Sequence, residues 1–209
     1  TIMPLGSTKS VYNVLSAEPE YSEFLEMVLG GDPDSVAQNL MSNTLGTKYT
    51  CPNKDNNYNM TLFDNYNYTV YVPTNNSIRE LIDNGYLPTW EDFEKYYTIS
   101  VESNDADSIA YAKIAKYIIK QRITDFVRYH VQDNSVAING APNMDVQGNY
   151  LLSNEFETMK LNPENKRYFS LKVSQSGPKA GSSAFINIED VMGNKRSVVT
   201  TSSNLYNHF

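Results

Sequence analysis

The sequence predicts an α+β fold, with helices in the first two-thirds of the chain and strands in the last third. Apolar residues recur at helical spacing within Ser10–Leu29 and within Asp105–Val131. From Ser135 onward the apolar runs are short and are separated by Gly, Pro and Asn, as expected for strands joined by turns. Because the helical and strand patterns are segregated along the chain, they favour α+β over a parallel α/β sheet.

The first predicted helix, Ser10–Leu29, carries an apolar stripe at the spacing i, i+3, i+4, i+7 and i+8. The stripe consists of Tyr21, Phe24, Leu25, Val28 and Leu29. Pro19 fits the first turn of a restarted helix, where no backbone N–H is needed, and Gly30-Gly31 gives a C-terminal stop. A short helix is predicted over Asp34–Ser42, and the Asn-rich stretch Gly46–Asn67 is predicted to be a surface loop.

The segment after this loop changes its period at Pro73. Tyr68–Val72 is aromatic and β-branched, which predicts a short strand, and Pro73 ends it because proline has no N–H to donate. Thr74 or Asn75 would then cap a helix that contains Ile78. We interpret this strand–proline–helix turn as a feature of the fold rather than as a catalytic or phosphate-binding site.

Two more helices are predicted before the strands begin. Thr89–Asp92 resembles a capping box and starts a helix that runs to about Tyr97. In the longest predicted helix, Asp105–Val131, one face is expected to be buried: Ile114, Ile118, Arg122 through its stem, Phe126 and Val127, with Ile119 and Ile123 beside them. The predicted strands are Val136–Ile138, Tyr150–Leu152, Phe156–Leu161, Tyr168–Val173, Ala184–Ile188 and Ser197–Thr200.

The composition disfavours several classes of protein. A chain of 209 residues can bury a core without disulfides or metals, and Cys51 is its single cysteine, so no intrachain disulfide can form. The net charge of −7 and the scattered basic residues disfavour nucleic-acid binding. No apolar run approaches the ~18 residues that predict a membrane span.

Motifs for catalysis, cofactors and metals are missing from the sequence. The chain has two histidines, His130 and His208, and contains no G-x-S-x-G, P-loop or G-x-G-x-x-G pattern. Two acidic pairs, Asp32/Asp34 and Asp105/Asp107, lack the Gly and distal Glu of a calcium loop; the second pair is better explained as the start of a helix. We therefore predict no catalytic residue, no metal and no cofactor, although paired carboxylates for glycoside chemistry stay open.

Two segments together resemble the signatures of fasciclin-like domains: TVYVPTNNSI (Thr69–Ile78) and ITDFVRYHV (Ile123–Val131). The first family pattern reads roughly T-V-F-A-P-T-(D/N)-x-A-F, and the second is an apolar-patterned helix that ends in Y-H-V. The direct matches are Thr69, Val70, Pro73, Thr74 and Asn75 in the first segment, and Tyr129, His130 and Val131 in the second. YSEFLEMV (Tyr21–Val28) is similar to the family's first helix, and FETM (Phe156–Met159) to its later extended stretch.

The resemblance covers about residues 10 to 200 and implies one fasciclin-like domain over residues 1–209. Its fold would be a β-sandwich or wedge decorated by an N-terminal set of helices. Residues 30–67 and 88–112 would be insertions, and the family's closing strand, N-G-x-V-H-x-I-D-x-V-L, has no counterpart before Phe209. Elaborated, Asn-rich domains of this kind look like those of bacterial envelope lipoproteins, which implies a signal peptide and a lipidated cysteine upstream of Thr1.

The implied function is extracytoplasmic adhesion at the bacterial cell surface, through binding of a protein or a polysaccharide, without catalysis. Contact with a membrane would come only from a lipid anchor outside this chain. Two alternatives stay open: a carbohydrate-active enzyme, and a structural spacer domain with no ligand of its own. The sequence specifies neither the identity of the partner nor the oligomeric state.

The candidate binding residues come from two sources. The resemblance implies a receptor-binding patch at Tyr129 and His130; the alternative is that Tyr129 packs in the core while His130 hydrogen-bonds locally. Loops on a rigid scaffold often carry recognition, and amphipathic aromatic residues suit it. The candidate aromatic contacts in the predicted insertions are Tyr49, Tyr58, Tyr66 and Trp90, of which Trp90 is alternatively a partly buried packing residue.

Overall fold

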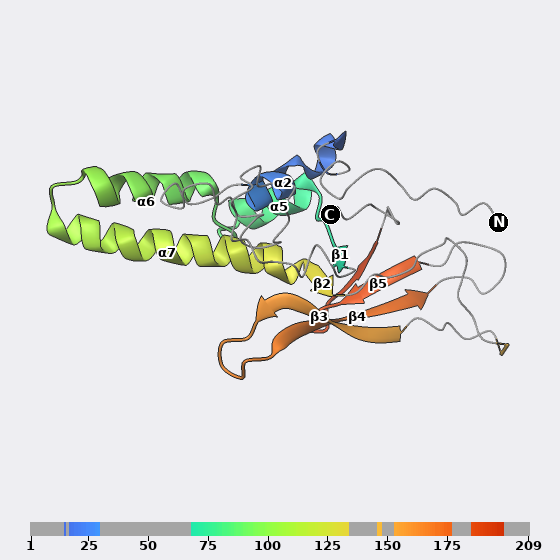
Figure 1. Cartoon of the computed structure of the whole chain (residues 1–209). Coiled ribbons are helices and arrows are strands. Elements are labelled where there is room, and N and C mark those ends of the chain that lie inside the picture. The colour runs from blue at the N-terminus through green and yellow to red at the C-terminus, as the bar shows by residue number, and fades with distance from the viewer. Residues whose placement is uncertain are drawn as a thin grey trace, which may run out of the picture. The chain divides into compact units, whose positions relative to one another are not determined.

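The computed structural model describes residues 15, 17–29, 68–133, 146–147, 153–176 and 185–198 (Figure 1). They confirm the α+β class. They belong to two compact units: a helical unit that includes Tyr71–Arg128 and the described residues before position 30, and a sheet unit that includes Tyr68–Val70 and the described residues from Tyr129 onward. Several predicted elements lie outside the described residues: Asp34–Ser42, Gly46–Asn67, Val136–Ile138 and Tyr150–Leu152.

Side chains cap the N-termini of three helices in the helical unit. Thr74 accepts a hydrogen bond from the N–H of Ser77, and Thr89 and Asp92 form the predicted capping box. The carboxylate of Asp105 accepts the N–H of Ser108 at 2.8 Å and so begins the longest helix. The described elements are η1 (Pro19–Tyr21), α2 (Ser22–Leu29), α5 (Asn75–Asp83), α6 (Trp90–Glu102) and α7 (Ala106–Tyr129).

The core of the helical unit is formed by apolar faces of these helices. Phe24 and Val28 of the predicted stripe are fully buried, and Phe24 contacts Phe126 of α7 at a ring-centroid distance of 6.5 Å. Each such side chain contributes about 1.5–3 kcal/mol when it leaves water. The buried apolar residues of the unit are Leu15, Phe24, Leu25, Met27, Val28, Ile78, Leu87, Phe93, Ala112, Ile123 and Val127.

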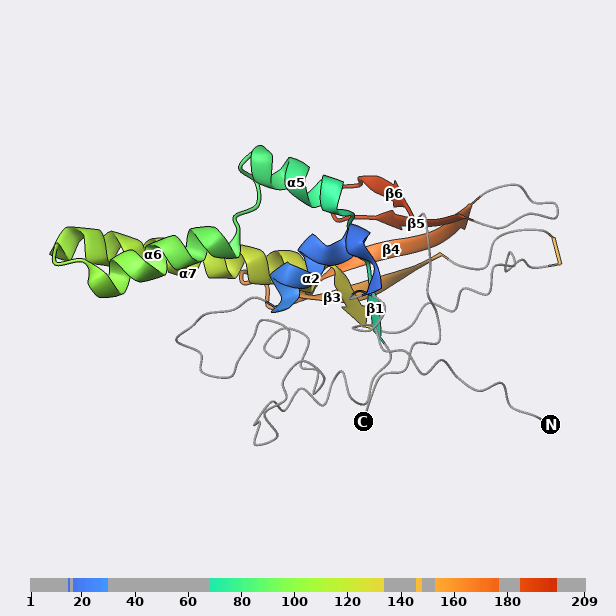
Figure 2. The same ribbon diagram turned by 90° about the horizontal axis from the view of Figure 1, so that it is seen from above.

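The prediction of which face of α7 is buried is wrong for the first half of the helix. Ile114 and Ile118 are exposed, whereas Ala112 is fully buried. The reason is that α7 carries apolar residues on two faces, and periodicity alone cannot tell which of them α6 covers. The ammonium of Lys116 lies 4.7 Å from the ring centroid of Tyr97, which places α6 on the Ala112 side. The two helices run side by side in Figure 1 and lie over each other when seen from above (Figure 2).

Helix α6 also continues beyond the predicted end at Tyr97, to Glu102. The β-branched residues after Tyr97 weaken the local helix signal. In this part of the helix the hydroxyl of Ser100, a buried residue, donates to the carbonyl of Tyr97 at 2.6 Å, so the polar side chain is satisfied where the helix packs. The predicted insertion near 88–112 therefore contains a helical hairpin made of α6 and the start of α7.

The sheet unit contains a curled antiparallel sheet whose six described strands follow one another in chain order (Figure 1). Its strands are β1 (Tyr68–Val70), β2 (Val131–Asp133), β3 (Ser153–Leu161), β4 (Tyr168–Ser176), β5 (Phe185–Glu189) and β6 (Lys195–Ser197). Strand β2 was not predicted, because Val131 continues the apolar period of α7. Strand β6 begins before its predicted start at Ser197, and β1 ends at Val70 instead of Val72.

Strands β3 and β4 pair with Phe156 opposite Leu171, and their register shifts between Glu157 and Leu161. Thr158 lies within this irregularity. Its hydroxyl donates to the carbonyl of Phe169 at 2.8 Å and accepts the N–H of Lys160 at 3.3 Å, so the side chain satisfies backbone groups there. The buried apolar residues of the unit are Val131, Leu171, Val173 and Ile186.

The described strands form one sheet, so the β-sandwich remains a prediction. Among the described helices, none combines the length and apolar character that crossing a membrane requires.

Candidate functional site

The two segments that carry the fasciclin-like resemblance meet in the sheet unit. Strands β1 and β2 are antiparallel neighbours, with Val70 opposite Val131 and Thr69 opposite Gln132. Gln132 is fully buried. Helix α7 ends at Tyr129, and His130 forms the turn into β2. The predicted site residues Tyr129 and His130 thus immediately precede strand β2 in the chain.

Tyr129 is held in place by three contacts. Its hydroxyl oxygen accepts the backbone N–H of Val191 at 3.2 Å. Its ring lies nearly perpendicular to the rings of Phe169 and His130, at centroid distances of 6.3 and 6.4 Å. Burial raises the pKa of the Tyr129 phenol; the hydrogen bond from Val191 opposes this, and the nearby Asp190 charge adds to it. The phenol is therefore neutral at neutral pH.

The turn between β5 and β6 lies next to Tyr129 and forms another part of the site. One carboxylate oxygen of Asp190 accepts the N–H groups of Met192 and Asn194 at 2.8 and 2.9 Å. Gly193 has a positive φ of 80°, which glycine adopts without strain. This internal bonding fixes the turn and leaves Val191 and Met192 exposed at its tip. An apolar pair is therefore presented next to Tyr129.

The charge of Asp190 is stabilised by the same turn. Partial desolvation raises the pKa of its carboxyl. Two other influences lower the pKa and outweigh that effect. They are the hydrogen bonds from the Asn194 side chain and from the backbone N–H groups of Asn194 and Met192, and the positive charge of Arg196. The net result is a pKa below the usual aspartate value. Asp190 is therefore ionised at neutral pH, and its carboxylate accepts hydrogen bonds within the turn.

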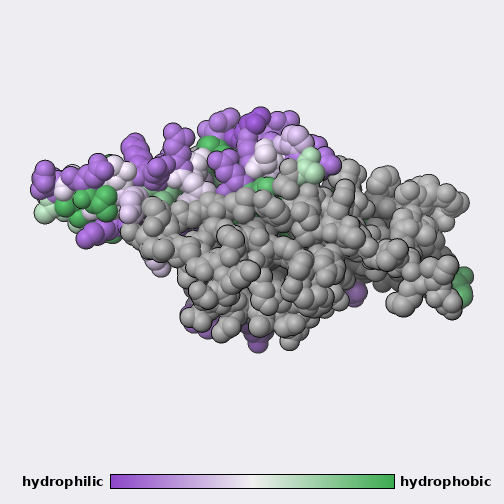
Figure 3. Space-filling view, turned by 45° about the horizontal axis from the view of Figure 1, so that its top comes forward, coloured by the Kyte–Doolittle hydropathy of each residue, from purple (hydrophilic) through white to green (hydrophobic). Residues whose placement is uncertain are grey.

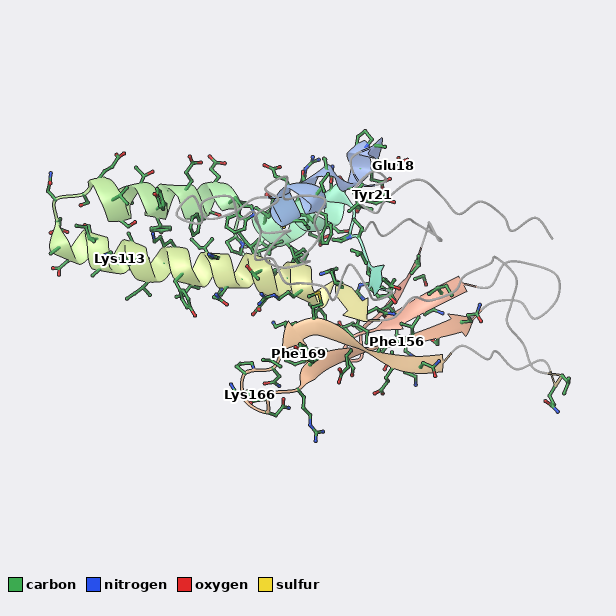
Figure 4. All side chains as sticks on the ribbon, in the orientation of Figure 1. Glu18, Tyr21, Lys113, Phe156, Lys166 and Phe169 are labelled. Carbon is green, nitrogen blue, oxygen red and sulfur yellow. The ribbon has the colours of Figure 1, made fainter. Side chains whose placement is uncertain are left out.

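A cation and an aromatic ring extend the site along the sheet. The ammonium of Lys160 on β3 lies 5.5 Å from the ring centroid of Phe169 on β4. Phe169 is labelled in Figure 4, with Phe156 on the neighbouring strand. We refer to Tyr129, His130, Lys160, Phe169 and the turn Asp190–Asn194 as the Tyr129 cluster. Tyr129, His130, Lys160 and Phe169 are all partly exposed, so the cluster forms a surface.

Sequence reasoning identified two members of this cluster and missed the others. The Asp190–Asn194 turn carries a recognisable signal, because Asp, Gly and Asn at these positions favour a tight turn. Its contact with Tyr129, however, joins residues 62 positions apart. No local pattern contains that information, and Lys160 and Phe169 carry no signal beyond that of ordinary strand residues.

The remaining candidate residues have different positions. Trp90 belongs to the helical unit, where its indole N–H donates to the carbonyl of Met27 at 3.0 Å and its ring meets Phe93 edge-on at 5.5 Å. These contacts are those of a packing residue, and a binding role for Trp90 remains a prediction. The other three aromatic candidates lie outside the described residues: Tyr49, Tyr58 and Tyr66.

The Tyr129 cluster offers aromatic faces, an imidazole, a cation and an exposed apolar tip. Within the described part of the chain, no group of three or more His, Cys, Asp or Glu side chains could hold a metal ion. The acidic residue Asp105, considered above for calcium, caps α7, and the hydrogen bonds from Ser108 lower the pKa of its carboxyl.

Comparison of the chain with protein-family models gave no match, and comparisons with curated proteins and with solved structures gave no significant match. The fasciclin-like resemblance therefore rests on the quoted segments alone.

Proposed function

We propose that this chain is an extracytoplasmic binding module of the fasciclin-like type, which recognises a protein or a polysaccharide at the bacterial cell surface and catalyses no reaction. In this proposal the described sheet is part of a fasciclin-like β-sandwich or wedge over residues 1–209. A lipid anchor outside the chain attaches it to the cell envelope. The binding surface includes the Tyr129 cluster.

The observation that carries this proposal is the support given to Tyr129 and His130. The phenol is fixed by the N–H of Val191, and its ring packs edge-on against Phe169. His130 lies beside it with its ring partly exposed. Rigid aromatic and imidazole side chains provide contact area at little cost in conformational entropy, as at the anchor positions of protein interfaces.

The pairing of the two signature segments supports the fold part of the proposal. A shared family motif is expected to mark residues that belong together in the fold. Val70 and Val131 come from the two segments and lie opposite each other in neighbouring strands. Thr74 caps the helix that begins within the first segment, which agrees with an architectural role for that motif.

The state of Asp190 favours binding over glycoside hydrolysis. A glycosidase needs two carboxylates about 5–10 Å apart across the sugar, one of them with a raised pKa. In the Tyr129 cluster the carboxylate of Asp190 accepts hydrogen bonds from its own turn, and its pKa is lowered. A carboxylate in this state is poorly suited to act as a general acid.

The test is a surface-binding screen of the chain against extracellular-matrix proteins and a panel of polysaccharides. For any saturable hit we expect His130→Ala to weaken binding by about tenfold or more, as for an interface anchor. The loss of binding should be larger than any loss of stability seen in a thermal melt, because His130 is partly exposed, although its ring also contacts Tyr129. The matched control is Lys166→Ala, an exposed position in the same unit, at the β3–β4 turn (Figure 4); it should bind like the wild type.

Two results would contradict the proposal. A specific ligand whose affinity is the same for wild type and His130→Ala would place the binding surface elsewhere. A screen with no saturable ligand would favour the spacer function instead.

A further inference from the structure

Helix α7 has an exposed apolar stripe, and at one edge of it the ring of Tyr111 also meets the ring of Tyr96 on α6 at a centroid distance of 5.9 Å. Tyr111, Ile114, Tyr117 and Ile118 are 65%, 62%, 63% and 47% exposed. In Figure 3 hydrophobic residues appear at the surface of the α6–α7 hairpin among hydrophilic ones. Four large side chains along one helix exceed the isolated exposed residues that are normal on a protein surface. We call these four residues the α7 stripe.

The α7 stripe is nearly symmetric about Ile114. Tyr111 precedes Ile114 by three residues and Tyr117 follows it by three, in the sequence YAKIAKY. At 100° per residue these three side chains lie within about 120° of one another on the helix surface. A twofold axis through Ile114 that reverses the helix direction would place Tyr111 of one copy and Tyr117 of the other at the same height along the interface, on opposite flanks of the two Ile114 side chains.

The charges that border the stripe are complementary under the same operation. Asp107 lies seven residues before Ile114 and Arg122 eight residues after it, and both are exposed. At 1.5 Å per residue they stand about 10.5 Å and about 12 Å from the centre, on the same flank of the helix. Reversal of the helix therefore brings Asp107 beside Arg122 of the second copy, and the symmetry repeats the pair.

We propose that the α7 stripe binds a second copy of this chain, with the two α7 helices antiparallel and Ile114 on the twofold axis. The contact is isologous, which means that the same surface patch of each copy forms the interface. Lys113 lies on the opposite flank, where its long stem lets the ammonium turn to solvent instead of facing its copy. This contact stands whether or not the Tyr129 cluster binds a ligand, and it goes beyond the proposed function.

The size of the stripe sets the expected strength of the dimer. From Asp107 to Arg122 the helix rises about 22 Å. Two helices in contact over that length bury less than a standard interface of about 1,600 Å², so we expect a weak dimer with a Kd in the micromolar range. Paired copies on one surface would raise the avidity for a repeated ligand without new contacts to it.

Sedimentation velocity of the chain from about 1 to about 300 µM tests the proposal, since this range brackets a micromolar Kd. The wild type should shift from monomer to dimer as the concentration rises. Ile114→Glu places two like charges at the axis and should raise the Kd at least about thirtyfold. Tyr86→Glu is the matched control: Tyr86 is 75% exposed and lies outside both the stripe and the Tyr129 cluster, so this variant should dimerise like the wild type.

A charge exchange tests the register of the pair. Asp107→Arg and Arg122→Asp should each raise the Kd about tenfold, because each change creates two repulsive pairs. The double variant should return to within about threefold of the wild type. Circular dichroism of every variant checks that the helices remain, which we expect because the changed side chains are exposed.

Three results would overturn the proposal. A wild type that stays monomeric over the whole range has no such contact. A dimer that persists in Ile114→Glu uses another surface. A double variant as weak as its parents excludes the antiparallel register.

Discussion

The side-chain carbonyl of Asn75 accepts a hydrogen bond at 3.0 Å from the backbone N–H of Glu23, a residue 52 positions earlier in the chain. The amide of Asn75 donates in turn to the carbonyl of Pro19 and to the hydroxyl of Ser22. Glu23 lies in the first turn of α2, whose N–H groups have no partner inside the helix. Asn75, the first residue of α5, therefore caps α2 from outside.

The other end of α2 is capped in a similar way. The indole N–H of Trp90 donates to the carbonyl of Met27, in the last turn of the helix. With eight residues, α2 is too short to be stable alone in water. Its apolar face supplies part of the stability, and side chains from α5 and α6 satisfy backbone groups at both ends.

Asn75→Ala should lower the free energy of unfolding by about 1–3 kcal/mol, because it removes three hydrogen bonds at a helix end. The loss is measured by urea denaturation. Asn76→Ala is the matched control, since Asn76 is exposed and next in sequence; its effect should stay within about 0.5 kcal/mol. Equal losses in the two variants would show that Asn75 acts only through helix propensity.

Trp90→Phe tests the C-terminal cap of α2. The smaller ring can keep its contact with Phe93, but it cannot donate to the carbonyl of Met27. We expect a loss of about 1–2 kcal/mol in the free energy of unfolding, from the unpaired carbonyl and the lost volume. Tyr86→Phe is a suitable control because Tyr86 is exposed. A Trp90→Phe variant as stable as that control would indicate that water replaces the indole without cost.

Substitutions in the two β-turns should change the stability of the protein in opposite directions. Gly193 and Lys166 both have positive φ, 80° and 59°. A Cβ at Gly193 would meet no atom within 4 Å, so the cost of Gly193→Ala comes from the backbone and should be about 1 kcal/mol. Lys166→Gly removes the same strain and should be neutral or stabilising by up to about 1 kcal/mol. Thermal melts of both variants check this; a stabilised Gly193→Ala would contradict it.

Local signals predicted much of this fold. Thr74, Thr89 and Asp105 cap helices as their residue types and positions suggested, since a cap depends on neighbours three residues away. Phe24, Leu25 and Val28 of the predicted stripe are buried in α2, and Met27, which the stripe did not contain, is buried as well. The α+β class was predicted because helical and strand patterns can each be recognised locally and are segregated along the chain.

Long-range contacts were not predictable. Thr74 and Asn75 were alternative caps for α5; the structure gives that role to Thr74 and directs Asn75 to α2, which no local pattern indicates. Ile114 was expected in the core, because periodicity shows that a face is apolar without showing what covers it. In the candidate site, Tyr129 and His130 came from a motif, whereas Phe169 and Val191 joined them only through the fold.

The titration of Asp190 gives a prediction about acid stability. The pKa of its carboxyl is lower in the folded protein than in the unfolded chain, where it takes the usual aspartate value. The folded state therefore binds protons at this site less readily than the unfolded state does. Stability from Asp190 is then fully present above the unfolded pKa and is lost as the pH falls through the folded pKa.

Asp190→Asn isolates this effect, because an asparagine can still accept the turn's backbone N–H groups but does not titrate. We expect the wild type to be the more stable protein at about pH 6 and the difference to shrink as the pH approaches about 2.5. Urea denaturation at several pH values measures it. Asp105, whose carboxyl also has a lowered pKa, contributes to both proteins equally and cancels from the difference. A difference that does not change with pH would mean that the Asp190–Asn194 turn is stabilised by the shape of its hydrogen bonds and not by the carboxylate charge.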